Sequence, residues 1–252
     1  EVPNLNENFR DYSSGTSLQA WWNFGEVNTE DYKLYNKAKS SPVSPLVYSS
    51  TDFLIPKTSE GSPYKARTDL KSFYFQKLRK QSYRLETASE IPATQSPITI
   101  AGWAKISELG GDGDATLGIF TRCRSGLVYT EDVTVTYKFS YRPSLRKFTF
   151  GLSGYVGAST TTLVLTTPAL SDMPQVSSIK DGQWFHYAVV ISSADQGYFK
   201  PSSDPRGALI KNYIKIYING KLMDCTVTGG NSGGGAELSS DLQFGIATAL
   251  LI

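Results

Sequence analysis

The feature that most constrains the fold is an alternation of apolar and polar residues with a period of two. In DVTVTYKFSY (132–141) it places on one face Val133, Val135, Tyr137, Phe139 and Tyr141. KFTFGLS (147–153) and YIKIYING (213–220) alternate in the same way. Because successive side chains of a strand point to opposite faces, this pattern predicts half-buried antiparallel strands.

Two further stretches are apolar on both faces. WFHYAVVI (184–191) and ITIAGWAKI (98–106) have this composition, which is expected of central strands covered on both sides. TTLVLTT (161–167) and LQFGIA (242–247) are shorter strand candidates. The segment 68–89 fits either a helical stripe or two strands, and its strand-forming residues favour two strands.

Turn residues separate these runs. Asn219–Gly220 follows an alternating run and precedes KLMDC, which is the strongest short signal for a β-hairpin. Gly-rich loops are predicted at 110–114 and 229–235, and a long Pro/Ser loop at 193–207. The sequence therefore predicts an all-β sandwich of roughly ten to fourteen strands.

Composition narrows the classes of partner. The 252 residues are enough for one large all-β domain, and 25 basic against 23 acidic residues give a net charge of +2, which argues against a nucleic-acid partner. No run of eighteen apolar residues predicts a membrane span. The start without Met suggests a processed chain or part of a longer one. Cys123 and Cys225 fit one bridge or two buried thiols equally well.

Several of these segments occur in an order that resembles a known family. The segments are LQAWWNFGE (18–26) with Trp22 and Phe24, SFYF (72–75), 82–106 with Trp103, RKFTFGLSG (146–154), GQWFHYAVVI (182–191), IKIYINGKLMD (214–224) and LQFGIA (242–247). Together they resemble the laminin-G-like branch of the concanavalin A-like lectin/glucanase superfamily. The resemblance implies a jelly roll of two antiparallel sheets over residues 18–252, preceded by an N-terminal arm at 1–17. It also implies recognition of glycans or proteins, outside cells or on particle surfaces.

The chain departs from the family pattern in three places. QKLRK (76–80) stands where the family has an Asp-Gly turn, the loop at 193–207 is longer than usual, and the chain stops at ATALLI. The expected final strand is therefore either missing, supplied by another chain, or part of a longer parent protein, because an unpaired edge would invite aggregation.

The only histidine, His186, occupies a structural place in the resemblance. By parity it shares a strand face with Trp184, Ala188 and Val190, and no carboxylate in the strand could orient it as a base. We therefore expect His186 to be a core residue rather than a catalyst. Glucanases of the superfamily carry two carboxylates at alternating positions of one strand. Asp112 and Asp114 have that spacing but lie in a Gly-rich loop, and no predicted strand has it. The chain is accordingly expected not to be an enzyme.

Three groups of residues are candidate binding sites. Asp112 and Asp114, flanked by glycines, suit a Ca²⁺ ion, as at the rim of many laminin-G-like domains, or an ordinary polar hairpin loop. Lys77, Arg79 and Lys80 belong to a basic run over 65–84 that suits acidic glycans, phosphate or an acidic neighbour, or else a solvated sheet edge. Tyr198 and Phe199, in the long loop, either stack on a ligand or pin the loop to the sandwich.

The sequence thus predicts a non-catalytic recognition or adhesion module for a glycan or protein ligand. The predicted location is extracellular or on a virion surface, as in a phage fibre or tail component. Two alternatives stay open: a purely structural virion or assembly protein, and a glycoside hydrolase with unrecognised acids.

Overall fold

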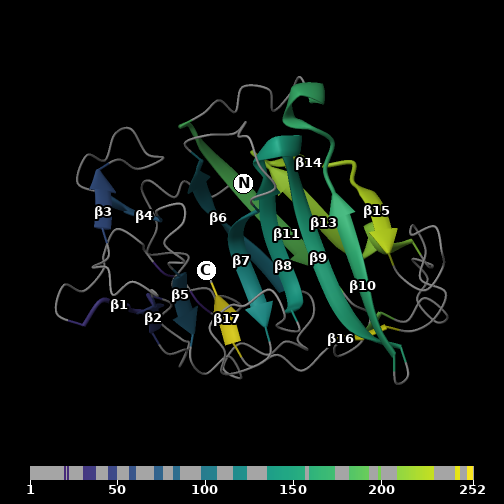
Figure 1. The fold of residues 1–252 in the computed structure, drawn as a ribbon, viewed down its shortest axis with the longest axis horizontal. Helices are drawn as coiled ribbons and strands as arrows, with labels where there is room; N and C mark the ends of the chain where they lie inside the picture. The colour runs from purple at the N-terminus through teal and green to yellow at the C-terminus, as the bar shows by residue number, and fades with distance from the viewer. Residues whose placement is uncertain are drawn as a thin grey trace. The chain divides into compact units, whose positions relative to one another are not determined.

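The structure is a computed structural model of the 252-residue chain. It describes residues 20, 22, 31–37, 45–49, 57–60, 71–75, 82–85, 98–106, 116–123, 135–156, 159–173, 182–192, 198–199, 209–229, 242–244 and 249–251. These residues form antiparallel strands joined by loops and short 3-10 turns, so the all-β prediction is confirmed (Figure 1). The chain divides into two compact units, residues 1–91 with 248–252 and residues 92–247.

The unit of residues 92–247 contains a sheet in which five strands follow one another as β7-β8-β9-β10-β15. Their bounds are Leu117–Cys123, Val135–Arg142, Lys147–Val156, Ser159–Thr166 and Thr226–Gly229. The long strand β9 pairs with β8 over its first part and with β16 (Leu242–Phe244) near its end, and β12 (Tyr198–Phe199) pairs with β16.

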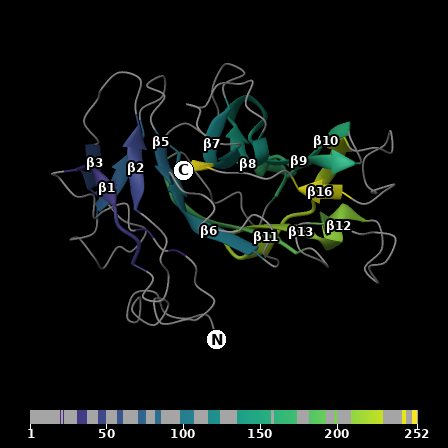
Figure 2. The ribbon, with the colours of Figure 1, turned by 90° about the horizontal axis from the view of Figure 1, so that it is seen from below.

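A second sheet of the same unit has four strands in the order β14-β13-β11-β6. Their bounds are Lys221–Leu222, Ile214–Ile218, Trp184–Ile191 and Ile98–Lys105. Seen from below, β6, β11 and β13 lie in one layer and β7, β8 and β9 in another (Figure 2). The unit is therefore a β-sandwich.

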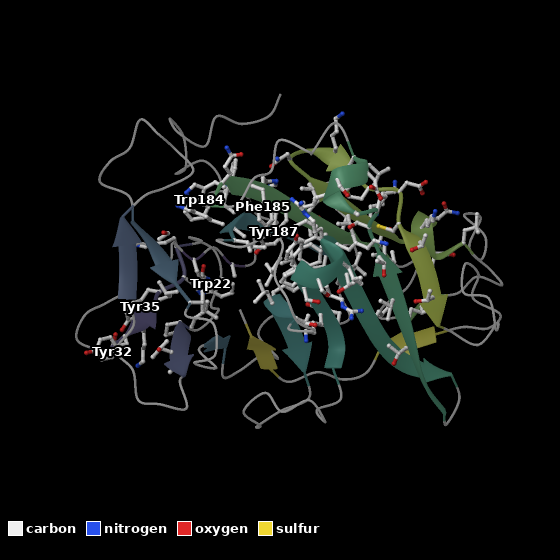
Figure 3. All side chains as sticks on the ribbon, turned by 45° about the horizontal axis from the view of Figure 1, so that its top comes forward. Trp22, Tyr32, Tyr35, Trp184, Phe185 and Tyr187 are labelled. Atoms are coloured by element: carbon white, nitrogen blue, oxygen red, sulfur yellow. The ribbon has the colours of Figure 1, made fainter. Side chains whose placement is uncertain are left out.

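Aromatic side chains join the two sheets across the core. The ring of Tyr187 on β11 lies 5.6 Å from that of Phe139 on β8, and Phe185 lies 5.3 Å from Phe148 on β9, measured between ring centroids. Figure 3 marks Phe185 and Tyr187 among these side chains. Burial of rings of this size is the main source of stability in such a core.

The three alternating runs are oriented as their patterns predicted. The residues on the buried face are Tyr137, Phe139 and Tyr141 in β8, Phe148, Phe150 and Leu152 in β9, and Ile214, Ile216 and Ile218 in β13. Each of these side chains is at most 4% exposed. The prediction from period-two alternation is therefore confirmed for these strands.

The predicted hairpin at Asn219–Gly220 is also confirmed. Both residues have positive φ, 49° and 77°, and Ile218 pairs with Lys221 directly across the turn. Two consecutive positive φ values are the geometry of a type I′ turn, in which glycine and asparagine are the residues of lowest cost.

The other unit, residues 1–91 with 248–252, carries a sheet of β1 (Lys33–Leu34), β2 (Leu46–Ser49), β5 (Ser82–Leu85) and β17 (Ala249–Leu251). β5 pairs with both β2 and β17. A separate pair joins β3 (Lys57–Glu60) to β4 (Lys71–Tyr74). The segment 68–89 therefore holds two strands, as predicted, although each pairs with other strands.

Two further predictions can be compared with the structure, and a third cannot. Cys225 is a buried, free thiol, so no bridge joins it to Cys123, and burial raises the pKa of Cys225 to about 12. In the part of the chain that is described, no helix is long and apolar enough to cross a membrane. The predicted arm at 1–17 lies outside the described residues.

Candidate functional site

The candidate site is the outer face of the four-stranded sheet, opposite the core. Residues paired directly across antiparallel strands point to the same side of a sheet. Because Phe185, Tyr187, Val189 and Ile191 of β11 face the core, the intervening residues and their partners form the outer face. We call this surface the outer platform. It comprises Thr99, Ala101, Trp103 and Lys105 of β6, Trp184, His186, Ala188 and Val190 of β11, Lys215 and Tyr217 of β13, and Leu222 of β14.

An aromatic pair stands at one side of the platform. Trp103 pairs with His186 across the strands, and their ring centroids lie 5.3 Å apart with the planes at 69°. The Trp103 side chain remains 40% exposed, although it lies in the middle of a strand. A large apolar ring in contact with water on a flat sheet is the kind of residue that binding surfaces use as an anchor.

A row of small and apolar residues crosses all four strands beside this pair. Ala101, Ala188, Tyr217 and Leu222 are paired in succession from β6 to β14. The alanines of β6 and β11 leave one end of the row low, while Leu222 at the other end, on β14, is 57% exposed. The platform therefore has a shallow floor over β6 and β11, with Trp103 beside it on β6 and Leu222 at the far end of the row.

Two hydrogen bonds join His186 of the platform to the hairpin residue Asn219. The backbone N–H of His186 donates to Asn219 Oδ1 at 2.9 Å, and the backbone N–H of Asn219 donates to the His186 carbonyl at 2.8 Å. The positive φ of Asn219 brings its side chain and its backbone amide to the same neighbour. The turn is thus hydrogen-bonded to β11 at His186, the residue whose ring contacts Trp103.

The core prediction for His186 is wrong. Its parity with Trp184, Ala188 and Val190 is as expected, but that face of β11 is the outer one, and His186 is half-buried. The core is filled from the other parity, by Phe185 and Tyr187. Partial burial lowers the pKa of the His186 imidazole below its usual value, which favours the neutral ring at neutral pH.

The predicted ligand residues Tyr198 and Phe199 form strand β12, which pairs with Gln243 and Leu242 of β16. The expected long loop at 193–207 is therefore interrupted by a strand. The side chains of Tyr198 and Phe199 lie outside what the structure describes, so their predicted role in binding stays a prediction.

The remaining predicted site residues lie outside the described residues: Asp112, Asp114, Lys77, Arg79 and Lys80. The predictions of a Ca²⁺ ion and of a basic binding ribbon are therefore untested. Within the described ranges, no group of three or more His, Cys, Asp or Glu side chains is placed to hold a metal ion.

A hollow lies in the same sandwich, beside the outer platform, with which it shares Lys215 and Leu222. It has a volume of about 310 Å³ and is lined by Leu165, Lys211, Ile214, Lys215, Leu222, Met223, Asp224 and Cys225. Its rim cation Lys211 is already bound to Asp224, with Nζ 2.7 Å from Oδ1. This contact pairs the charge of Lys211 only, because Lys215 also lines the hollow; apart from Asp224, the rest of the lining is apolar.

The sequence contains a signal for the outer platform, in two segments whose apolar residues predict burial on both faces. WFHYAVVI and ITIAGWAKI are apolar on both faces. In a two-layered sandwich only one face of each sheet is covered by the other sheet, so apolar residues on the second face are left for a ligand or partner. Trp103, Tyr217 and Leu222 belong to that second face.

Comparison with known proteins found no matching family model, no matching curated protein and no matching solved structure.

Proposed function

We propose that this protein is a non-catalytic glycan-recognition module that binds its ligand on the outer platform. The observation that carries the proposal is the exposed ring of Trp103 beside a floor of alanines on a sheet face. A sugar ring has an apolar face of C–H groups and a polar edge of hydroxyls. The first packs on an aromatic ring, and the second hydrogen-bonds to neighbouring polar groups.

The shape of the surface favours an extended ligand over a single small molecule. The row from Ala101 to Leu222 crosses four strands, which at about 4.8 Å between neighbours is roughly 14 Å. The platform is shallow and open, whereas sites for isolated small molecules are usually enclosed clefts. A saccharide chain lying on the sheet fits this geometry.

The family resemblance supports the same proposal. We propose that the sandwich is a jelly roll of the laminin-G-like, concanavalin A-like type, in an extracellular or virion-surface protein. The proposed module is non-catalytic because no predicted strand carries a carboxylate pair at the alternating spacing that glucanases of the superfamily use, and the one pair with that spacing, Asp112 and Asp114, lies in a Gly-rich loop. A structural assembly role predicts that the same apolar face is covered by another chain.

The test is an array of immobilised neutral and charged oligosaccharides probed with the full chain and with Trp103→Ala. Loss of the anchor ring is expected to weaken binding by roughly ten- to a hundredfold. The matched control is Phe75→Ala, because Phe75 is also an aromatic that is 40% exposed but belongs to the other unit. The control should bind as the unaltered chain does.

Two results would contradict the proposal. Equal binding by Trp103→Ala and the unaltered chain would place the ligand elsewhere. Absence of binding to every saccharide, together with oligomers in sedimentation that dissociate in Trp103→Ala, would show that the platform is an interface between copies and would favour the structural role.

A further inference from the structure

The hollow beside the outer platform opens where β14 ends. β14 pairs only with the end of β13, at Tyr217 and Ile218. The next residue, Met223, donates its backbone N–H to the Ile216 carbonyl at 2.8 Å, and the chain then crosses to β15, which pairs with β10 in the other sheet. The beginning of β13 is therefore left without a β14 neighbour, and the hollow lies at this crossing between the two sheets.

The floor of the hollow consists of residues that belong to the core. Leu165 of β10 and Ile214 of β13 come from opposite sheets, and each is at most 2% exposed. Met223 and Cys225 complete the floor and are also buried. Because burial raises the pKa of the Cys225 thiol to about 12, this side chain stays neutral and acts as a small apolar group. The hollow thus has an apolar base that is continuous with the core.

The rim of the hollow carries one cation that the protein does not pair. Lys211 donates to Asp224 Oδ1 at 2.7 Å, and this contact lowers the pKa of the Asp224 carboxyl. Lys215 is exposed and, in the part of the chain that is described, makes no ion pair with a carboxylate. Two lysines against one aspartate therefore leave one positive charge at the rim, above an apolar floor.

The volume of the hollow limits the size of its ligand. Sites for small molecules measure roughly 300–1,000 Å³, and this hollow, at about 310 Å³, is at the lower end of that range. Leu222 adds an exposed apolar wall beside the floor. A compact ligand with one apolar part and one negative charge therefore matches the hollow in size, polarity and charge.

We propose that the hollow binds a small aliphatic carboxylate, of the size of a medium-chain fatty acid, at a site separate from that of the glycan. The hydrocarbon tail covers the floor between Leu165 and Ile214, and the carboxylate contacts the Lys215 ammonium at the rim. Removal of apolar surface from water supplies most of the affinity, and the exposed ion contact selects the charged head group. Because that head group stays at the rim in water, no unpaired charge is buried.

The test is a titration of the full chain with matched ligands, followed by two-dimensional NMR of the backbone amides. Octanoate has the tail and the charge, 1-octanol has the tail alone, and acetate has the charge alone. For octanoate, with about ten non-hydrogen atoms, we expect a dissociation constant of roughly 0.1–1 mM. 1-Octanol should bind about three- to fivefold more weakly, because it lacks the ion contact, and acetate should show no saturable binding.

The same spectra locate the site. The amide resonances expected to shift are those of residues that line the hollow, Lys211, Ile214, Met223 and Cys225. β6 lies at the opposite edge of the same sheet from β14, so its amides serve as the internal control and should not shift.

Variants then assign the two parts of the ligand. Lys215→Gln should reduce the affinity for octanoate to that for 1-octanol and leave the affinity for 1-octanol unchanged. The matched control is Lys221→Gln, because Lys221 is an exposed lysine of the adjacent strand that does not line the hollow. Leu222→Ser removes the apolar wall without opening the core, since Leu222 is exposed, and should weaken both ligands by about threefold or more.

Four results would overturn the proposal. Equal affinity for octanoate and 1-octanol would remove the role of the charge. Absence of shifts around the hollow would remove the site. Loss of the octanoate preference in Lys221→Gln as complete as in Lys215→Gln would remove the assignment to Lys215. A response to octanoyl chains only in phospholipid vesicles, with none to free octanoate, would identify a lipid surface as the ligand in place of the free acid.

Discussion

At the scale of single residues, Gly102 is a position in the core of the sandwich where a larger side chain has no room. It lies on the core side of β6, opposite Tyr187, and a Cβ at this site would meet the Tyr187 hydroxyl at 2.7 Å and its ring carbon Cζ at 2.9 Å. The Tyr187 ring cannot easily retreat, because it is packed against Phe120 and Phe139. We expect Gly102→Ala to lower the free energy of unfolding by about 1–3 kcal/mol, measured by urea denaturation.

Gly151→Ala is the matched control for this substitution. Gly151 also lies inside a strand, but nothing stands within 4 Å of an added Cβ. Reduced flexibility of the unfolded chain should then stabilise the protein by about 0.4–1 kcal/mol. The two substitutions therefore differ in sign, and destabilisation of equal size by both would contradict the role assigned to Tyr187.

His186 makes the protonation of the platform measurable, because it is the only histidine in the chain. Partial burial lowers its pKa below 6.5, so the folded state favours the neutral imidazole. The stability that neutral His186 contributes is fully present above the pKa that this histidine has in the unfolded chain. It is lost as the pH falls through the lower pKa that His186 has in the folded chain. A single imidazole resonance followed by NMR from pH 4 to 8 should titrate below 6.5, and a midpoint at or above 6.5 would contradict the burial of the ring.

At the scale of elements, the hairpin between β13 and β14 depends on Asn219 in two ways. Its φ is 49°, and its Oδ1 accepts the backbone N–H of His186. Asn219→Ala loses the bond and also the short polar side chain that lets asparagine tolerate the left-handed region, so we expect a cost of about 1–2 kcal/mol in thermal or urea unfolding. Asn219→Asp keeps the acceptor and should cost less.

Asn219→Gly separates the two contributions, because glycine accepts the positive φ but has no acceptor. If the bond to β11 matters, the glycine variant should lose stability relative to Asn219→Asp and should shift the His186 resonance. A glycine variant as stable as the unaltered chain would show that the turn geometry alone determines the hairpin.

Sequence patterns predicted these elements unevenly, for physical reasons. β8, β9 and β13 were predictable because one face of each is apolar and the other is mostly polar, so alternation determines both the strand and its orientation. β11 is apolar on both faces, so its pattern predicted a strand but not which side faces the core. That choice depends on Phe139 and Phe148, which come from strands distant in sequence and pack on Tyr187 and Phe185.

The platform could not be predicted either, because it too depends on contacts between strands that are distant in sequence. Trp103, Ala188 and Tyr217 come from three strands, and only the register between those strands makes them neighbours. The sequence signals that were strongest for a site, the Gly/Asp loop with Asp112 and the basic run with Lys77, depend on residues near one another along the chain. Local signals of this kind identify loops, whereas a sheet face is assembled from contacts between distant segments.

At the scale of the whole molecule, the two ends of the chain contribute to one unit. β17, at residues 249–251, pairs with β5 through Leu250 opposite Leu85 and Leu251 opposite Arg84. Deletion of residues 248–252 removes this neighbour, so the β5 amides that faced β17 are expected to lose hydrogen-exchange protection by on the order of tenfold or more. The amides of β11 and β13, in the unit of residues 92–247, serve as the internal control and should retain theirs. Unchanged protection at β5 would mean that β2 alone holds that strand, and a loss spread evenly over β11 and β13 would mean that the two units unfold as one.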